Sequence, residues 1–191
     1  MMTVKTTISR DLPKNNISLE SLVPQNHLVR KLDKAIDLSF IRNKVSHLYS
    51  NLGTNSIDPV VLFKIIIIQY TFGIRSMRQA IREIEVNIAY RWYLGYSIDE
   101  PIPHFSTFGK VYKRKFEGTD IFEEIFQEII REITRCKFLS NESVFIDGTH
   151  IKANANSKKS TNKTVEVQSK VYQELLNEEI KLDRELHKKK L

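Results

Sequence analysis

The sequence predicts a mainly α-helical protein, in which a multi-helix bundle is followed by one β-hairpin and a charged C-terminal helix. Apolar residues recur at helical spacing from about residue 27 to 137. Caps, prolines and glycines mark where the helices begin and end. Near residue 144 the apolar period changes to two, the period of a strand. The apolar fraction of 41% is enough for a real core.

The predicted elements divide the chain into four parts: an extended N-terminal arm (1–23), a helical domain (24–137), a hairpin segment (138–160) and a charged helix or linker (161–191). Within these parts the expected helices cover residues 27–38, 40–52, 59–72, 76–85, 88–94, 106–116, 119–137 and 165–189, and the hairpin covers 144–156.

Local signals justify these elements in order. Asp58-Pro59 supplies an N-cap acceptor and a proline at the first helical position. The helix that follows is apolar nearly all round, which places it at the centre of a bundle. Ser76 and Gln79 form a capping-box pattern, and Ser106 is the expected cap of the helix after it. Glycines end the helices at 53, 73, 95 and 118. The last helix has a thin apolar stripe of Val171, Leu175, Leu182 and Leu186.

Composition narrows the function classes. Thirty Lys and Arg against 23 Asp and Glu give a net charge of +7. The pI near 9.4 fits a nucleic-acid partner, although many basic proteins bind none. The single cysteine excludes an internal disulfide and fits a reducing cytoplasm. The chain begins without the apolar core of a signal peptide. Its most apolar run, 60–72, is shorter than the roughly 20 residues of a membrane span, so no membrane partner is expected.

Residues 103–116 carry four cations and no acid. A capped helix start followed by cations suits phosphate binding, but the same pattern describes the solvated face of an ordinary bundle helix. Arginines on the two preceding helices favour DNA, because with this segment they would form a helix-turn-helix-like face. The candidate DNA-binding residues are Arg75, Arg78, Arg82, Arg91, Ser106, Thr107, Lys110, Lys113, Arg114 and Lys115.

Other candidate sites have simpler explanations. Trp92, with Tyr90 and Tyr93, is able to stack on bases but belongs more naturally in the core of so compact a helix. His104 and His150 lack the spacing and the partners of a zinc site. The acidic residues of the last helix alternate with lysines, as on a solvated face.

Asp147 stands at the end of an apolar strand, just before Gly148. A carboxylate in that place is costly unless a cation, usually a metal ion, lies opposite it. Asp-Gly is also a very common hairpin turn, and the residues by themselves favour the turn.

Five motifs in order resemble the bacterial insertion-sequence DDE transposases with an InsH-type N-terminal domain. They lie at 58–64 (DPVVLFK), 70–79 (YTFGIRSMRQ), 89–95 (AYRWYLG), 105–108 (FSTF) and 145–156 (FIDGTHIKANAN). The resemblance implies a helical DNA-binding region and an RNase H-like nuclease domain, whose first strand carries the first of three catalytic carboxylates. Asp147 falls on that position, where it would be both a catalytic residue and a Mg²⁺ ligand. In such enzymes two Mg²⁺ ions activate the nucleophile and stabilise the leaving oxygen.

Two departures qualify the resemblance. The family's loop usually has Pro-Asp-His before Ser-Thr, whereas this chain has Pro103-His104-Phe105. The second Asp and the Glu belong on later elements, so we expect an incomplete RNase H-like domain that is inactive alone and does not bind Mg²⁺ stably. The expected function is DNA binding at transposon ends. The alternatives are an active transposase whose missing carboxylates come from a partner chain or frameshift product, and a stand-alone DNA-binding regulator. A homodimer is a further possible assembly.

Overall fold

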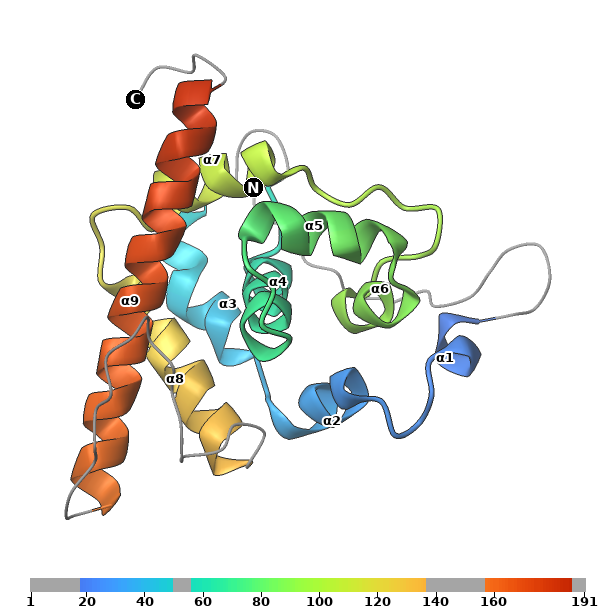
Figure 1. The fold of residues 1–191 in the computed structure, drawn as a ribbon, viewed down its shortest axis with the longest axis horizontal. Coiled ribbons are helices and arrows are strands. Elements are labelled where there is room, and N and C mark those ends of the chain that lie inside the picture. The colour runs from blue at the N-terminus through green and yellow to red at the C-terminus, as the bar shows by residue number, and fades with distance from the viewer. Residues whose placement is uncertain (1–17, 50–55, 137–156, 187–191) are drawn as a thin grey trace. The chain divides into compact units, whose positions relative to one another are not determined.

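A computed structural model describes residues 18–49, 56–136 and 157–186 of the chain (Figure 1). Within these ranges the protein is helical, as predicted. The elements are α1 (Leu19–Leu22), α2 (Leu28–Ala35), α3 (Phe40–Val45), the 3-10 helix η1 (Ser46–Leu48), α4 (Pro59–Thr71), α5 (Met77–Val86), α6 (Ile88–Leu94), α7 (Phe105–Lys115), α8 (Ile121–Arg135) and α9 (Ser157–Leu186).

The predicted hairpin and Asp147 lie outside the described residues. Inside them the only β-type pairing is at the single bridge positions Ser18 and Ser56, so this part of the chain gives no support to an RNase H-like sheet. Among the helices of the described ranges, none combines the length and the apolar character that a membrane crossing requires.

The chain divides into two compact units, Met1–Thr119 and Asp120–Leu191. We call them unit 1 and unit 2 and describe each by itself. Helix α8, which the sequence analysis assigned to the helical domain, belongs to unit 2.

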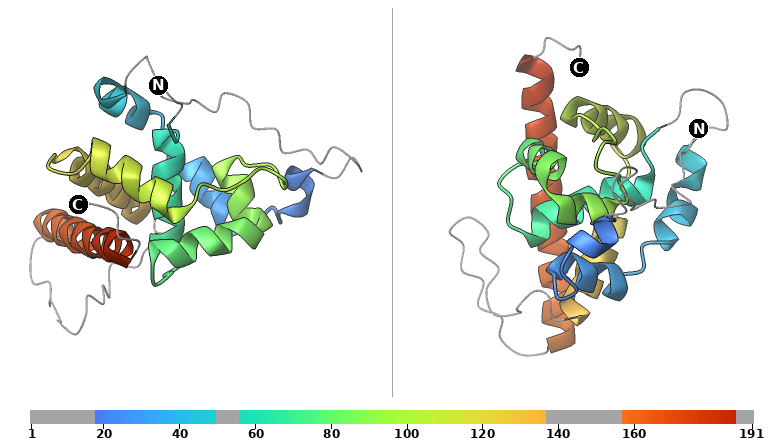
Figure 2. Two further views of the ribbon diagram at one scale, coloured as in Figure 1. Left: turned by 90° about the horizontal axis from the view of Figure 1, so that it is seen from above. Right: turned by 90° about the vertical axis from the view of Figure 1, so that its right-hand side faces the viewer.

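Helix α4 is the core of unit 1. Asp58 caps it by accepting from the Val60 backbone N–H at 2.9 Å, and Gly73 follows its end with a left-handed φ of 61°. Most of its side chains are buried, as expected for a helix that is apolar all round. It packs against α3, α5 and α6. Figure 2 shows the same helices in two further views.

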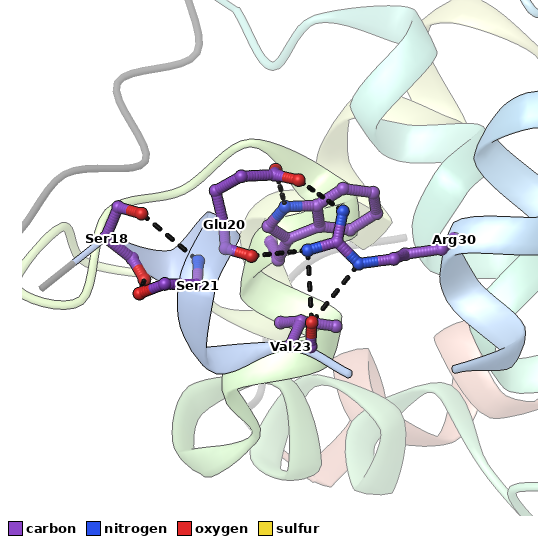
Figure 3. Close-up of polar contacts among 6 residues, drawn as sticks. Ser18, Glu20, Ser21, Val23 and Arg30 are labelled. Carbon is purple, nitrogen blue, oxygen red and sulfur yellow. Dashed lines mark hydrogen bonds and ion pairs between the residues drawn. The ribbon is translucent and has the colours of Figure 1, made fainter. Parts of the chain in front are cut away.

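The end of the predicted extended arm is helical. Ser18 caps α1 by accepting from the Ser21 N–H at 3.1 Å, and Leu19 is buried. The physical reason is a polar clamp in which Arg30 donates to the Val23 carbonyl from Nε at 3.2 Å and from Nη2 at 3.0 Å (Figure 3). Arg30 also pairs with the Glu20 carboxylate. These bonds satisfy backbone carbonyl groups that have no partner within α1, a helix too short to be stable alone.

Helices α5 and α6 are joined through a single residue. Asn87 donates its N–H to the Glu83 carbonyl at the end of α5, and its side chain accepts from Ala89 and Tyr90 at the start of α6. Gly95, with a φ of 78°, ends α6 as predicted.

The described part of unit 2 consists of α8 and α9, which pack against each other. Helix α8 is amphipathic, with Phe122, Ile125, Phe126, Ile129, Ile130 and Ile133 buried. Helix α9 begins earlier than predicted, at Ser157. Its thin apolar stripe is largely exposed, with Leu175, Leu182 and Leu186 at 60%, 59% and 78%.

The face of α9 that meets α8 contains polar residues. The Tyr172 ring lies 4.6 Å from the Phe126 ring, and the Ser169 hydroxyl donates to the Glu123 carbonyl at 3.4 Å. Leu176 and Ile180 are buried on the same helix. This face was missed because Ser169 and its polar neighbours interrupt the apolar pattern.

Candidate nucleic-acid interface

Helix α7 has one buried and one exposed side. Phe105, Phe108, Val111 and Tyr112 are buried, and they fix the helix against the rest of unit 1. Thr107, Lys110 and Arg114 are exposed on the other side. Their spacing of three and four residues places them along one face of the helix.

The cap of α7 differs from the prediction. The N-cap is His104 and not Ser106, because the His104 Nδ1 accepts from the Ser106 backbone N–H at 3.1 Å. The Ser106 hydroxyl lies 2.9 Å from the same nitrogen. Ser106 is therefore a partner of the cap within the first turn.

Two of the predicted DNA-binding lysines have partners inside unit 1. Lys115 donates to the Leu48 carbonyl, and its Nζ lies 4.7 Å from the centre of the Tyr49 ring. Lys113 is 3.7 Å from the carboxylate of Glu117, which follows the end of α7. Lys115 thus ties α7 to the 3-10 helix, which leaves Lys110 and Arg114 as the exposed cations of α7.

Helix α5 contributes cations at its start and in its middle. Arg75 just before the helix and Arg82 within it are exposed. Arg78 lies with its guanidinium carbon 5.3 Å from the centre of the Phe105 ring, a cation–π distance. This contact joins the first turns of α5 and α7, which pack against each other.

Arg91 is placed differently from what the sequence suggested. It is 9% exposed and donates to the carbonyls of Glu85, Ser97 and Glu100 at 3.0, 2.8 and 2.9 Å. A buried guanidinium with three carbonyl acceptors holds the segment after α6 against the end of α5. Arg91 therefore has a structural role and is not part of the exposed basic face.

The aromatic residues of α6 are core residues, as the simpler interpretation held. Tyr90, Trp92 and Tyr93 are 7%, 3% and 0% exposed. The Trp92 indole N–H donates to the Glu20 carboxylate at 2.6 Å, and the Arg30 guanidinium lies 4.5 Å from the ring centre. With its ring covered, Trp92 is not available to stack on a base.

We define the basic face of unit 1 by the exposed residues Arg75, Arg82, Thr107, Lys110 and Arg114. A family described as Transposase domain (DUF772) matches residues 17–114, just over half of the chain, and this match includes every residue of that face. The chain belongs to this transposase domain family. Neither the curated proteins nor the solved structures gave a match.

The transposase domain ends within α7, so the family match covers nearly all the helices of unit 1. His104 caps α7 from the loop before it, with an imidazole nitrogen in place of the more common side-chain oxygen.

The electrostatics around α7 have one further component. Burial, followed by the negative charge of Asp58, raises the pKa of the Tyr49 hydroxyl well above its usual value. Tyr49 therefore stays neutral beside Lys115, so the lysine meets an uncharged ring and a carbonyl. Sequence reasoning had no signal for this pairing, because Leu48 and Lys115 are distant in the chain.

No metal centre is found in the part of the transposase chain that the structure describes. There, no group of three or more His, Cys, Asp or Glu side chains is arranged to hold an ion. Asp147 and His150 lie outside it. The described residues thus provide no site that fits Mg²⁺, and we derive no chemical step through a metal.

Proposed function

We propose that unit 1 is a DNA-binding domain that contacts the phosphate backbone of transposon ends through its basic face. The observation that carries the proposal is the division of helix α7 into a buried side and an exposed side. Its apolar side is buried in the unit while Thr107, Lys110 and Arg114 stand exposed, in a chain of the transposase domain family. Lys, Arg and Thr side chains are typical phosphate ligands, and such contacts set the position of a protein on the duplex.

The structure of unit 1 reduces the set of candidate contacts. Arg91 and Lys115 bind carbonyl groups within the unit. Arg78 and Lys113 have contacts to Phe105 and Glu117 that support the helices. The proposal therefore rests on the residues of the basic face.

Removing two cations from α7 tests the proposal. We expect the double variant Lys110→Ala, Arg114→Ala to bind a duplex carrying the terminal inverted repeat more weakly than the unchanged chain. The logarithm of the affinity falls linearly with the logarithm of the salt concentration, and each lost phosphate contact makes this line less steep by about 0.9. The steepness should therefore decrease by roughly two. Fluorescence anisotropy over a salt series measures both quantities.

A matched control is available on α2. Lys31 and Lys34 are exposed cations in the same unit, on a helix at the opposite end of unit 1 from α7 in Figure 1. Lys31→Ala, Lys34→Ala removes the same charge and should leave most of the affinity. Equal losses in the two double variants would mean that only net charge matters, and would contradict a specific face. A random duplex of the same length measures preference for the repeat.

The proposal also concerns the catalytic site that the resemblance to DDE transposases implies. Asp147 is the proposed first Mg²⁺ ligand of an RNase H-like active site. For this chain we propose DNA binding in transposition.

A further inference from the structure

The imidazole of His104 is held in one orientation at the start of the basic face. Its Nδ1 accepts from the Ser106 N–H at 3.1 Å and lies 2.9 Å from the Ser106 hydroxyl. The side chain is exposed, and its Nε2 has no partner among the described residues.

This cap determines where the ring proton lies. A nitrogen that accepts a hydrogen bond from a backbone N–H carries no proton, so a neutral imidazole in this position is protonated at Nε2. The two ring nitrogens lie on opposite edges of the ring. The Nε2–H is therefore directed away from Ser106 as an uncharged donor.

We propose that His104 is a further DNA contact of unit 1, which donates from Nε2 to a phosphate oxygen while Nδ1 retains the helix cap. This inference rests on the proposed DNA-binding function. Its surroundings suit an anion, because Thr107 and Lys110 are exposed in the turns that follow and residues 103–116 contain no acid. Arg78, over the neighbouring Phe105 ring, adds positive charge at the same end of the helix.

A second histidine separates this role from capping alone. His27 caps α2 in the same way, with Nδ1 accepting from the Val29 N–H at 3.2 Å. Its ring is half-buried, with the Phe72 ring centre 6.4 Å away, and α2 is outside the basic face. His27 thus offers the same cap without the proposed contact.

The test compares His104→Ser and His27→Ser in the full chain, because serine retains an N-cap acceptor and removes the imidazole. We expect His104→Ser to weaken binding to the inverted-repeat duplex about fivefold, the equivalent of one hydrogen bond. The salt slope should stay unchanged, because a neutral donor releases no counterion, whereas Lys110→Ala lowers the slope by about one. The thermal midpoint of either serine variant should match that of the unchanged chain.

Four results would overturn the inference. Full affinity in His104→Ser would leave His104 as a cap alone. A reduced salt slope in that variant would show that the imidazole binds as a cation, against the neutral donor. If Lys110→Ala, Arg114→Ala also bound as tightly as the unchanged chain, the proposed function would fail, and this inference with it. Equal weakening in His27→Ser would point to a capping effect on stability.

Discussion

Buried and half-buried cations hold unit 1 together at several places. Lys64, on the most apolar helix, donates at 2.8 Å to both the Asp33 carboxylate and the Tyr93 carbonyl. Arg30 and Arg91 similarly donate to carbonyl groups of neighbouring segments. These bonds satisfy polar backbone groups that would be costly to bury alone. A positive charge in this sequence is therefore not by itself a sign of a DNA contact.

Tyr93 provides a prediction at the scale of one residue. Its hydroxyl is fully buried and has no hydrogen-bond partner among the described residues. Tyr93→Phe removes an unsatisfied polar group and retains the ring beside Lys64. We expect the free energy of unfolding to rise by about 1 kcal/mol, measured by urea denaturation.

The larger truncation Tyr93→Ala serves as the contrast. It removes the ring as well and should cost about 3–5 kcal/mol through the cavity that it leaves. A loss of stability in Tyr93→Phe would contradict the prediction, because it would mean that the hydroxyl has a partner such as an ordered water.

Several helix ends could be predicted from the sequence at the scale of elements. Asp58, Ser76 and the glycines after α4 and α6 act as their residue types predict, because caps depend on local chemistry. The face that a helix buries depends on its neighbour. For α9 the exposed leucines were the more apolar stripe, yet the side that meets α8 includes Ser169.

Adjacent leucines on α9 test this assignment. Leu176 is 3% exposed and Leu175 is 60% exposed. We expect Leu176→Ala to lower the free energy of unfolding by about 2–4 kcal/mol, because it leaves a cavity in a packed seam. Leu175→Ala deletes the same side-chain atoms at a position exposed to solvent. It should change the free energy of unfolding by less than about 0.5 kcal/mol. Equal effects on thermal unfolding would contradict the burial of this face.

The candidate site was predictable in outline and not in detail. The basic pattern of 103–116 led correctly to an amphipathic helix with Lys110 and Arg114 exposed. The roles of Arg91 and Lys115 could not be predicted from the sequence, because each side chain binds backbone carbonyl groups that only the fold brings close to it. The His104 cap was missed because Ser106 has the more common capping side chain.

At the scale of the whole molecule, buried tyrosines link stability to alkaline pH. Burial raises the pKa of Tyr70 to about 12, and it raises the pKa of Tyr49, Tyr90, Tyr93 and Tyr96 as well. An unfolded tyrosine ionises near pH 10. Above that value the unfolded chain loses protons that the folded chain retains, so stability should be unaffected below about pH 10 and fall as pH rises further.

Thermal unfolding followed between about pH 8 and 11.5 measures this dependence. The Tyr93→Phe variant has one buried phenol fewer and should lose stability less steeply. Lysine deprotonation in the same range affects both proteins alike, so the difference between them isolates the tyrosine. Parallel curves for the two proteins would contradict a contribution from Tyr93.

Trp92, which contacts Glu20 and Arg30 of the polar clamp, gives the molecule a single fluorescent reporter. The chain has one tryptophan, and its indole is hydrogen-bonded to Glu20 and covered by Arg30. All indole emission therefore originates where α1, α2 and α6 meet. Detachment of α1 would expose that ring to water and shift its emission to longer wavelength, whereas events on the solvent side of α7 would leave the spectrum unaltered. The intrinsic fluorescence of this protein is thus a measure of how firmly its first helix is docked.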